Sequence, residues 1–148
     1  MPFLEEQVVI KQPLSVCFER MTDFTNSPQF MENVIEVEAL TEGPVREGFQ
    51  FKETREIRGR KASAVIEVVS YEPNKKYTVR SEQSGIEVIY HYAFLETTVG
   101  TKIDFTGELM TKGFRNYMLK PLIKKIIKKE DQHHLEHVKA VMEKDDAN

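Results

Sequence analysis

TKIDFTGELMTKGFRNYMLKPLIKKIIKKEDQHHLEHVKAVMEK occupies residues 101–144, and the spacing of its apolar side chains changes once along its length. In the first part, Ile103, Phe105 and Leu109 recur at even steps, which is the period of a β-strand. After Gly113 apolar residues recur every three or four positions almost to the end of the stretch. This spacing predicts a helix roughly 45 Å long. A helix with one apolar side needs a sheet to pack against.

The region upstream of this helix is dominated by the two-residue period. Runs of alternating apolar and polar residues predict strands at 3–11, 34–40, 48–58, 61–72, 76–82, 86–96 and 101–111. Short turns join most of them, and Gly59-Arg60 is typical of a two-residue hairpin. A short helix is predicted at 13–21, and the turn-rich stretch 22–32 contains a second one near 27–30.

These elements together predict an α+β fold of one domain spanning 1–148. A curved antiparallel sheet of about seven strands would wrap around the long C-terminal helix, with two short helices after the first strand. Pro121 is expected to kink the long helix or to mark the start of its main segment. Gly107 is expected to form a bulge or a bend in the last strand.

Composition limits the classes of function. A chain of 148 residues with net charge −3 shows no electrostatic footprint for nucleic acid. No apolar run reaches the length of a membrane span, and the N-terminus does not resemble a signal peptide. Cys17 is the single cysteine, so no internal disulfide can form, and we expect it to be a buried structural thiol in a cytoplasmic protein.

The order of elements and several local patterns resemble one known superfamily. The patterns are Met21-Thr22-Asp23-Phe24, Asn26-Ser27-Pro28-Gln29-Phe30, Gly48-Phe49 and Tyr71-Glu72-Pro73-Asn74. They are similar to those of the START-related polyketide cyclase/dehydrase and lipid-transport superfamily, which has the helix-grip fold. Many of its members have Trp where this chain has Phe30. The resemblance implies a cavity between sheet and helix, and it does not select a chemistry.

The predicted cavity wall is a row of aromatic side chains that share one phase on their strands. Pure packing is the alternative interpretation of such a row. The row consists of Phe49, Phe51, Tyr90, Tyr92, Phe94 and Phe105. On the helix, Phe114, Met118, Leu122 and Ile126 are predicted to form the lid, and Phe24 and Phe30 to lie at the mouth.

Glu53 and Arg55 share the phase of Phe51, so both would point inward if the strand is regular. Buried charges must pair, and an inward pair would anchor the polar head of a ligand, such as a carboxylate or a ketone. The alternative is a bulge or a strand end that leaves both side chains in water.

The C-terminal helix carries two polar groups of residues with open interpretations. The first group is Glu130, His133, His134 and His137. Within it, the spacing of His133 and His137 would let both reach one metal ion, which Glu130 could join, and a solvent-facing surface is the alternative. We predict no metal site, because no ligand from another segment is identifiable. Lys120, Lys124 and Lys128 belong to a basic run that is either a solvated face or a weak contact with a membrane surface.

Three functions remain compatible with these patterns. The first is a module that binds a small hydrophobic or lipid-like ligand, as a monomer or homodimer and without a cofactor. The second is an enzyme of the cyclase, dehydratase or hydrolase kind using the same cavity. The third is a partner-protein module with a filled core and an exposed apolar patch around residues 24–31.

Overall fold

The computed structural model describes residues 2–31, 33–57 and 59–146. Two predicted segments, 22–32 and 48–58, each include one position outside this description, Glu32 and Arg58. Among the described residues, no helix combines the length and the apolar content needed to cross a bilayer.

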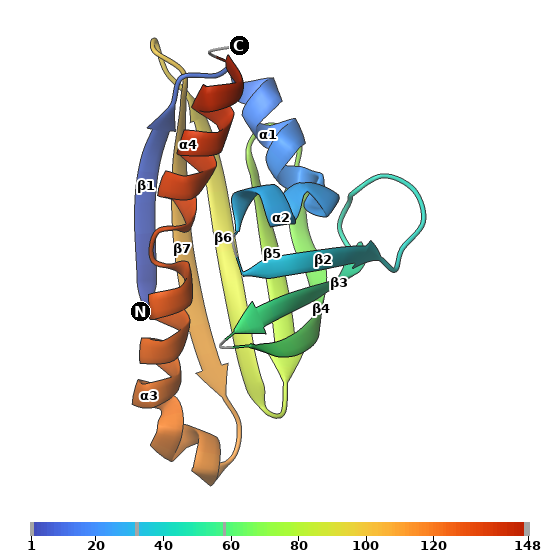
Figure 1. Ribbon diagram of the computed structural model, residues 1–148, viewed down its shortest axis with the longest axis vertical. Coiled ribbons are helices and arrows are strands. Elements are labelled where there is room, and N and C mark those ends of the chain that lie inside the picture. Colours follow the sequence, from blue (N-terminus) through green and yellow to red (C-terminus); the bar gives the residue numbers. More distant parts are fainter. Residues whose placement is uncertain (1, 32, 58, 147–148) are drawn as a thin grey trace.

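Seven antiparallel strands form one sheet in the order β1-β7-β6-β5-β4-β3-β2 (Figure 1). Their bounds are β1 Leu4–Ile10, β2 Val34–Ala39, β3 Gln50–Ile57, β4 Arg60–Glu72, β5 Lys76–Gln83, β6 Ile86–Glu96 and β7 Thr101–Thr111. Strands β2 to β7 follow the chain from neighbour to neighbour, and β1 pairs with β7. The predicted number and direction of strands are therefore confirmed. Arg60, predicted as a turn residue, instead pairs with Ile57 as the first residue of β4.

A bulge or a bend was predicted at Gly107, and the bulge is wrong. It pairs in regular register with Leu4 on one side and with Tyr90 on the other. A Cβ at this position would lie 2.9 Å from Cε1 of Tyr90 and 3.3 Å from Cβ of Leu4. The glycine therefore provides space for the Tyr90 ring over the middle of β7.

The connection between β1 and β2 contains three short helical elements: α1 Leu14–Thr22, the 3-10 turn η1 Phe24–Asn26, and α2 Ser27–Phe30. Pro13 precedes α1, where a missing N–H is tolerated. Cys17, Phe18 and Met21 are buried at helical spacing, so α1 covers one end of the sheet. The predicted helix at 27–30 is confirmed as α2.

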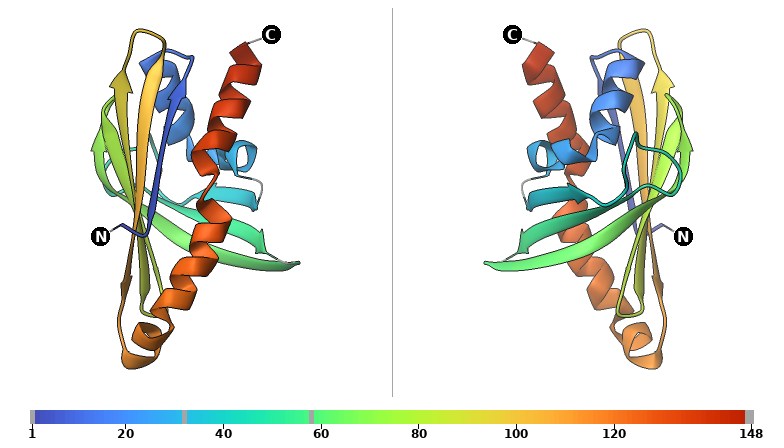
Figure 2. Two further views of the ribbon diagram at one scale, coloured as in Figure 1. Left: turned by 90° about the vertical axis from the view of Figure 1, so that its left-hand side faces the viewer. Right: turned by 90° about the vertical axis from the view of Figure 1, so that its right-hand side faces the viewer.

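The long C-terminal helix consists of two segments, α3 Phe114–Asp131 and α4 His134–Asp146, separated by Gln132 and His133. Figure 2 shows both segments on the concave side of the sheet, with β3 and β4 curving around toward them. Pro121 lies inside α3 and is not where the helix is interrupted.

The start of α4 is held by a carboxylate from β1. The backbone N–H groups of Leu135 and Glu136 donate to Oε1 and Oε2 of Glu6, over 2.9 and 3.2 Å. Such a cap satisfies N–H groups that a helix start leaves without intrahelical partners. On the side of α4 that faces the sheet, Leu135, Val138 and Met142 are completely buried. The cap and this apolar side place the first turn of α4 over the sheet.

We predict that Gly107→Ala lowers the free energy of unfolding by about 1–3 kcal/mol, because the new methyl group must displace the ring of Tyr90. Urea denaturation followed by circular dichroism measures this difference. In a Tyr90→Ala background the same substitution should cost much less, since the ring is absent. An equal cost in both backgrounds would show that the glycine has another role.

Candidate functional site

A cavity of about 240 Å³ lies between the concave face of the sheet and the junction of α3 and α4. Strands β3 to β6 form its wall, and α1, η1 and α2 close one side. Its lining consists of Met21, Phe24, Ser27, Phe30, Met31, Phe51, Glu53, Arg55, Ala62, Ser63, Ala64, Ile66, Tyr77, Val79, Arg80, Ser81, Gln83, Val88, Tyr90, Tyr92, Ile127, Asp131, His134 and Val138.

Five of the predicted aromatic residues border this cavity: Phe24, Phe30, Phe51, Tyr90 and Tyr92. Phe24 stacks on Phe51 with ring centroids 4.4 Å apart, so the turn η1 is packed onto β3. Ligand contact stays a prediction for all five residues.

Three other members of the predicted row belong to the packed core. Phe94 packs against Phe18 at a centroid distance of 5.1 Å, and Phe105 lies 4.8 Å from the ring of Tyr92. Phe49 is also buried, 6.5 Å from Phe51. They lie beside the lining residues on the same face of the sheet and do not themselves border the cavity.

The predicted lid was wrong in its orientation. Phe114, Met118, Leu122 and Ile126 are exposed to solvent by 79, 62, 54 and 52% respectively. Apolar residues occupy more than half of the circumference of α3, so their spacing alone could not select the inward side. Ile127 borders the cavity instead.

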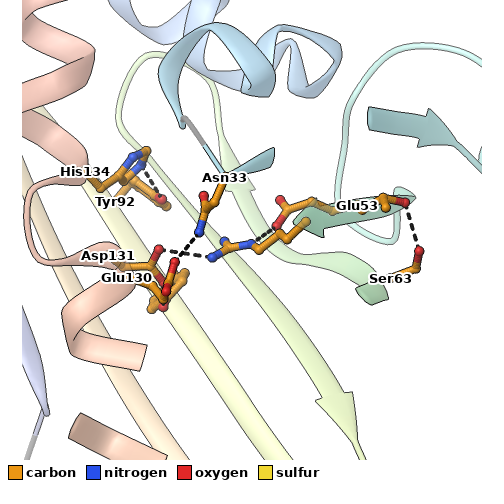
Figure 3. A network of polar contacts seen from close by, with 10 residues as sticks. Asn33, Glu53, Ser63, Tyr92, Glu130, Asp131 and His134 are labelled. Atoms are coloured by element: carbon orange, nitrogen blue, oxygen red, sulfur yellow. Dashed lines mark hydrogen bonds and ion pairs between the residues drawn. The ribbon is translucent and has the colours of Figure 1, made fainter. Parts of the chain in front are cut away.

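Glu53 and Arg55 both point inward, as the phase of β3 predicts. Nε of Arg55 donates to Oε1 of Glu53 over 2.5 Å, and its Nη1 donates to Oδ1 of Asp131 over 3.1 Å (Figure 3). Asp131 is only 2% exposed and Glu53 only 7%. Burial disfavours the charged guanidinium, but Asp131 and Glu53 outweigh it and raise the pKa of Arg55 above its ordinary value. The guanidinium thus stays charged between two carboxylates.

Asp131 has a second partner across the cavity. The hydroxyl of Tyr90 donates to its Oδ2. Burial, followed by the charge of Asp131, raises the pKa of Tyr90 well above its ordinary value. The last residue of α3 is therefore joined to both β3 and β6.

His134, the first residue of α4, forms a hydrogen bond with Tyr92 over 3.0 Å through Nε2. Burial lowers the pKa of His134 to about 4, and burial raises the pKa of Tyr92. Both rings are therefore neutral near pH 7. Among the described residues, the buried Nδ1 of His134 has no hydrogen-bond partner.

The other members of the predicted helix cluster lie outside this cavity. Glu130 accepts a hydrogen bond from Nδ2 of Asn33 over 2.7 Å, and His133 is exposed beside Glu136. His137 borders a neighbouring hollow of about 260 Å³, together with Glu130 and His133. Within the described part of the chain, no three His, Cys, Asp or Glu side chains are arranged to hold a metal ion.

Two polar residues of the cavity, Asp131 and His134, are not predicted as ligand-site residues from the sequence. Asp131 follows Ile127 by one helical turn, and an inward Arg55 requires an acidic partner from another element. This requirement could have directed attention to Asp131 as the acidic partner. The sequence places His134 only within a polar cluster on the helix. Its side chain points toward Tyr92 because the helix is interrupted at residues 132–133, and this interruption is not visible in the sequence.

We predict that His134 stays neutral down to about pH 4, while its ordinary pKa is 6.5. Between these two values the unfolded chain binds a proton that the folded chain does not, so stability decreases as the pH falls through this window. The loss should be about 2–3 kcal/mol relative to His134→Gln, measured by urea denaturation at pH 7 and pH 4.

NMR titration of the imidazole resonances gives an independent measurement. A His134 resonance that titrates near the ordinary value of 6.5, or a stability difference that does not change with pH, would contradict the burial of a neutral ring.

Known proteins share the fold of this chain, and one protein family matches its sequence. Solved structures with similar folds include Ara h 8.0201, with TM-score 0.74, 17% identity and coverage of 94% of this chain and 95% of that one. A START superfamily protein from Mycobacterium smegmatis matches with TM-score 0.70 and 14% identity over 95 and 97% of the two chains. The di-domain ARO/CYC StfQ from the steffimycin biosynthetic pathway matches with TM-score 0.77 and 13% identity, over 98% of this chain and 51% of that one.

At these identities the structural matches establish the fold alone, which is the predicted helix-grip fold. A search of curated proteins gave no match. Residues 1–143, however, match the family described as polyketide cyclase / dehydrase and lipid transport. The chain belongs to this polyketide cyclase/dehydrase and lipid-transport family.

Proposed function

We propose that the protein binds a small, neutral, hydrophobic ligand in the cavity between the sheet and the α3–α4 junction. The observation that carries this proposal is the composition of the cavity wall. Aromatic and aliphatic side chains form most of it. One polar cluster lies where α3 ends, and the other polar side chains of the lining are Ser27, Ser63, Arg80, Ser81 and Gln83. Such a combination is typical of pockets that bind apolar molecules and orient them by a few polar contacts.

Charge favours an uncharged ligand. The cluster at the α3–α4 junction holds two carboxylates, Glu53 and Asp131, and one guanidinium, Arg55, which is already engaged by both. Arg80, which also borders the cavity, is paired with Glu82 and Glu87. A ligand carboxylate would enter a region of net negative charge and would need Arg55 to release a partner. An ester, ketone, ether or alcohol carries no such penalty.

The imidazole of His134 favours a ligand with an acceptor oxygen. We assign the donor role in the Tyr92–His134 hydrogen bond to the Tyr92 hydroxyl, because no other described residue forms a hydrogen bond with it; the neutral ring then carries its hydrogen on Nδ1. This N–H is buried without a partner, which costs about 1–3 kcal/mol. His134 borders the cavity, although Nδ1 itself has almost no accessible surface. A ligand oxygen would satisfy this N–H if a small rotation of the ring turned Nδ1 toward the cavity.

An enzyme using the same cavity is the second candidate, and the Tyr92–His134 pair is the observation that favours it. A histidine and a tyrosine that share a hydrogen bond can polarise a carbonyl or move a proton. The low pKa of His134 makes it a weak base, however, and the raised pKa of Tyr92 keeps the phenol protonated. These properties suit hydrogen bonding to a ligand better than proton abstraction.

The apolar patch on which the partner-protein alternative was based is not exposed. That alternative required an exposed apolar patch around residues 24–31, but the side chains of Phe24 and Phe30 are only 8 and 5% exposed.

We predict that native mass spectrometry of the purified protein detects a bound hydrophobic molecule, and that Ala64→Trp abolishes the adduct by filling the cavity from β4. Val65→Trp is the matched control, because Val65 lies on the opposite face of the same strand and is 47% exposed. Val88→Phe fills the cavity from β6 if Ala64→Trp proves unstable. Equal adducts in Ala64→Trp and Val65→Trp would place the ligand elsewhere.

The same spectra separate binding from catalysis. A carrier or sensor should hold a molecule of the same mass in the wild type, in His134→Gln and in Tyr92→Phe. An enzyme should accumulate its substrate in the two variants, so that the adduct mass differs from that in the wild type by the atoms transferred, for example by one water.

A further inference from the structure

The outward side of α3 carries apolar side chains that no part of the described structure covers. Phe114, Met118, Leu122 and Ile126 follow one another at four-residue spacing, so they form one row along the helix. Each is more than half exposed. The partly buried positions of α3 are on another side and include Ile123 and Ile127. An exposed row of this kind is unusual on a surface that functions only in water.

The same surface is strongly basic. Residues 114–129 contain six of the 21 Lys and Arg of the chain and none of its 24 Asp and Glu. Arg115, Lys125, Lys128 and Lys129 are exposed. None of the six cations forms an ion pair with a described residue. Because the chain as a whole carries −3, the remainder is acidic, and positive charge is concentrated on this helix.

We propose that α3 docks on the surface of a membrane containing anionic lipids, lying in the plane of the interface. The apolar row would enter the boundary between headgroups and acyl chains, and the flanking lysines would reach the phosphates. Each lysine near an anionic surface contributes about 1 kcal/mol. A second copy of this chain fits less well, because the exposed cations of one α3 would face the same cations of the other across a symmetric α3–α3 contact.

This proposal goes beyond ligand binding and is tested without a ligand. The chain has no Trp, so a single introduced Trp reports on its own surroundings. Leu122→Trp places the probe in the row on α3. Leu95→Trp is the matched control, because Leu95 is 61% exposed near the end of β6, at the opposite end of the sheet from the start of α3 (Figure 1).

With phosphatidylglycerol vesicles, we expect the emission of Leu122→Trp to shift to shorter wavelength, while that of Leu95→Trp stays unchanged. Vesicles of phosphatidylcholine alone should give a much smaller shift. In the Leu122→Trp background, Lys125→Gln with Lys129→Gln should weaken vesicle binding roughly tenfold or more. Lys11→Gln with Lys75→Gln removes the same charge from exposed positions outside α3 and should have little effect. Added salt should weaken binding.

Two results would overturn the proposal. One is the absence of any shift for Leu122→Trp with phosphatidylglycerol vesicles, while circular dichroism shows the variant folded. The other is a shift that appears without vesicles as the protein concentration rises, which would assign the row to contact between two copies. Neither result bears on the cavity, so failure here is distinguishable from failure of the proposed ligand site.

Discussion

The largely enclosed guanidinium of Arg55, whose side chain is 21% exposed, is the constraint on which the rest of the site depends. A charge inside a protein must be paired, and Glu53 lies only two residues away on the same strand. The second carboxylate, Asp131, comes from a helix 76 residues further along the chain. Their pairing ties the end of α3 to β3 across the concave face of the sheet.

The position of Asp131 in turn fixes its neighbours. The helix is interrupted directly after it, and Glu6 of β1 caps the new start at Leu135 and Glu136. His134 lies between these two fixed points and meets Tyr92. Two strands from opposite parts of the sheet therefore hold the helical junction: β3 holds the end of α3, and β1 holds the start of α4. The cavity lies between this junction and the concave face of the sheet.

Much of the fold could be predicted because periodicity reports directly on which side of an element is buried. All seven strands were expected from the two-residue period, and the inward direction of Glu53 and Arg55 follows from the phase of Phe51 on β3. On α3 the same method failed, since apolar residues cover more than half of its circumference. The break at residues 132–133 was not predictable either, because it contains neither proline nor glycine and its cap comes from Glu6, 129 residues away from Leu135.

The chemistry of the cavity suits a neutral ligand. The guanidinium of Arg55 is already shared by two carboxylates, and burial keeps the imidazole of His134 and the phenols of Tyr90 and Tyr92 uncharged. Such a site recognises a molecule by shape, apolar contact and one or two hydrogen bonds. The apolar row of α3 and the cations that flank it lie outside the cavity. The proposed membrane-docking surface and the proposed ligand site would therefore act as separate parts of one molecule.

The most direct test of the central claim is a methyl-resolved NMR titration with methyl decanoate and, in parallel, with decanoate. We expect the ester to shift the methyl resonances of Val79, Val88 and Ile127, which border the cavity, and not those of the exposed Leu95 and Met110. The acid, with the same chain but a negative charge, should bind more weakly. Shifts confined to the exposed methyls, or stronger binding of the acid, would contradict a neutral ligand site between the sheet and the α3–α4 junction.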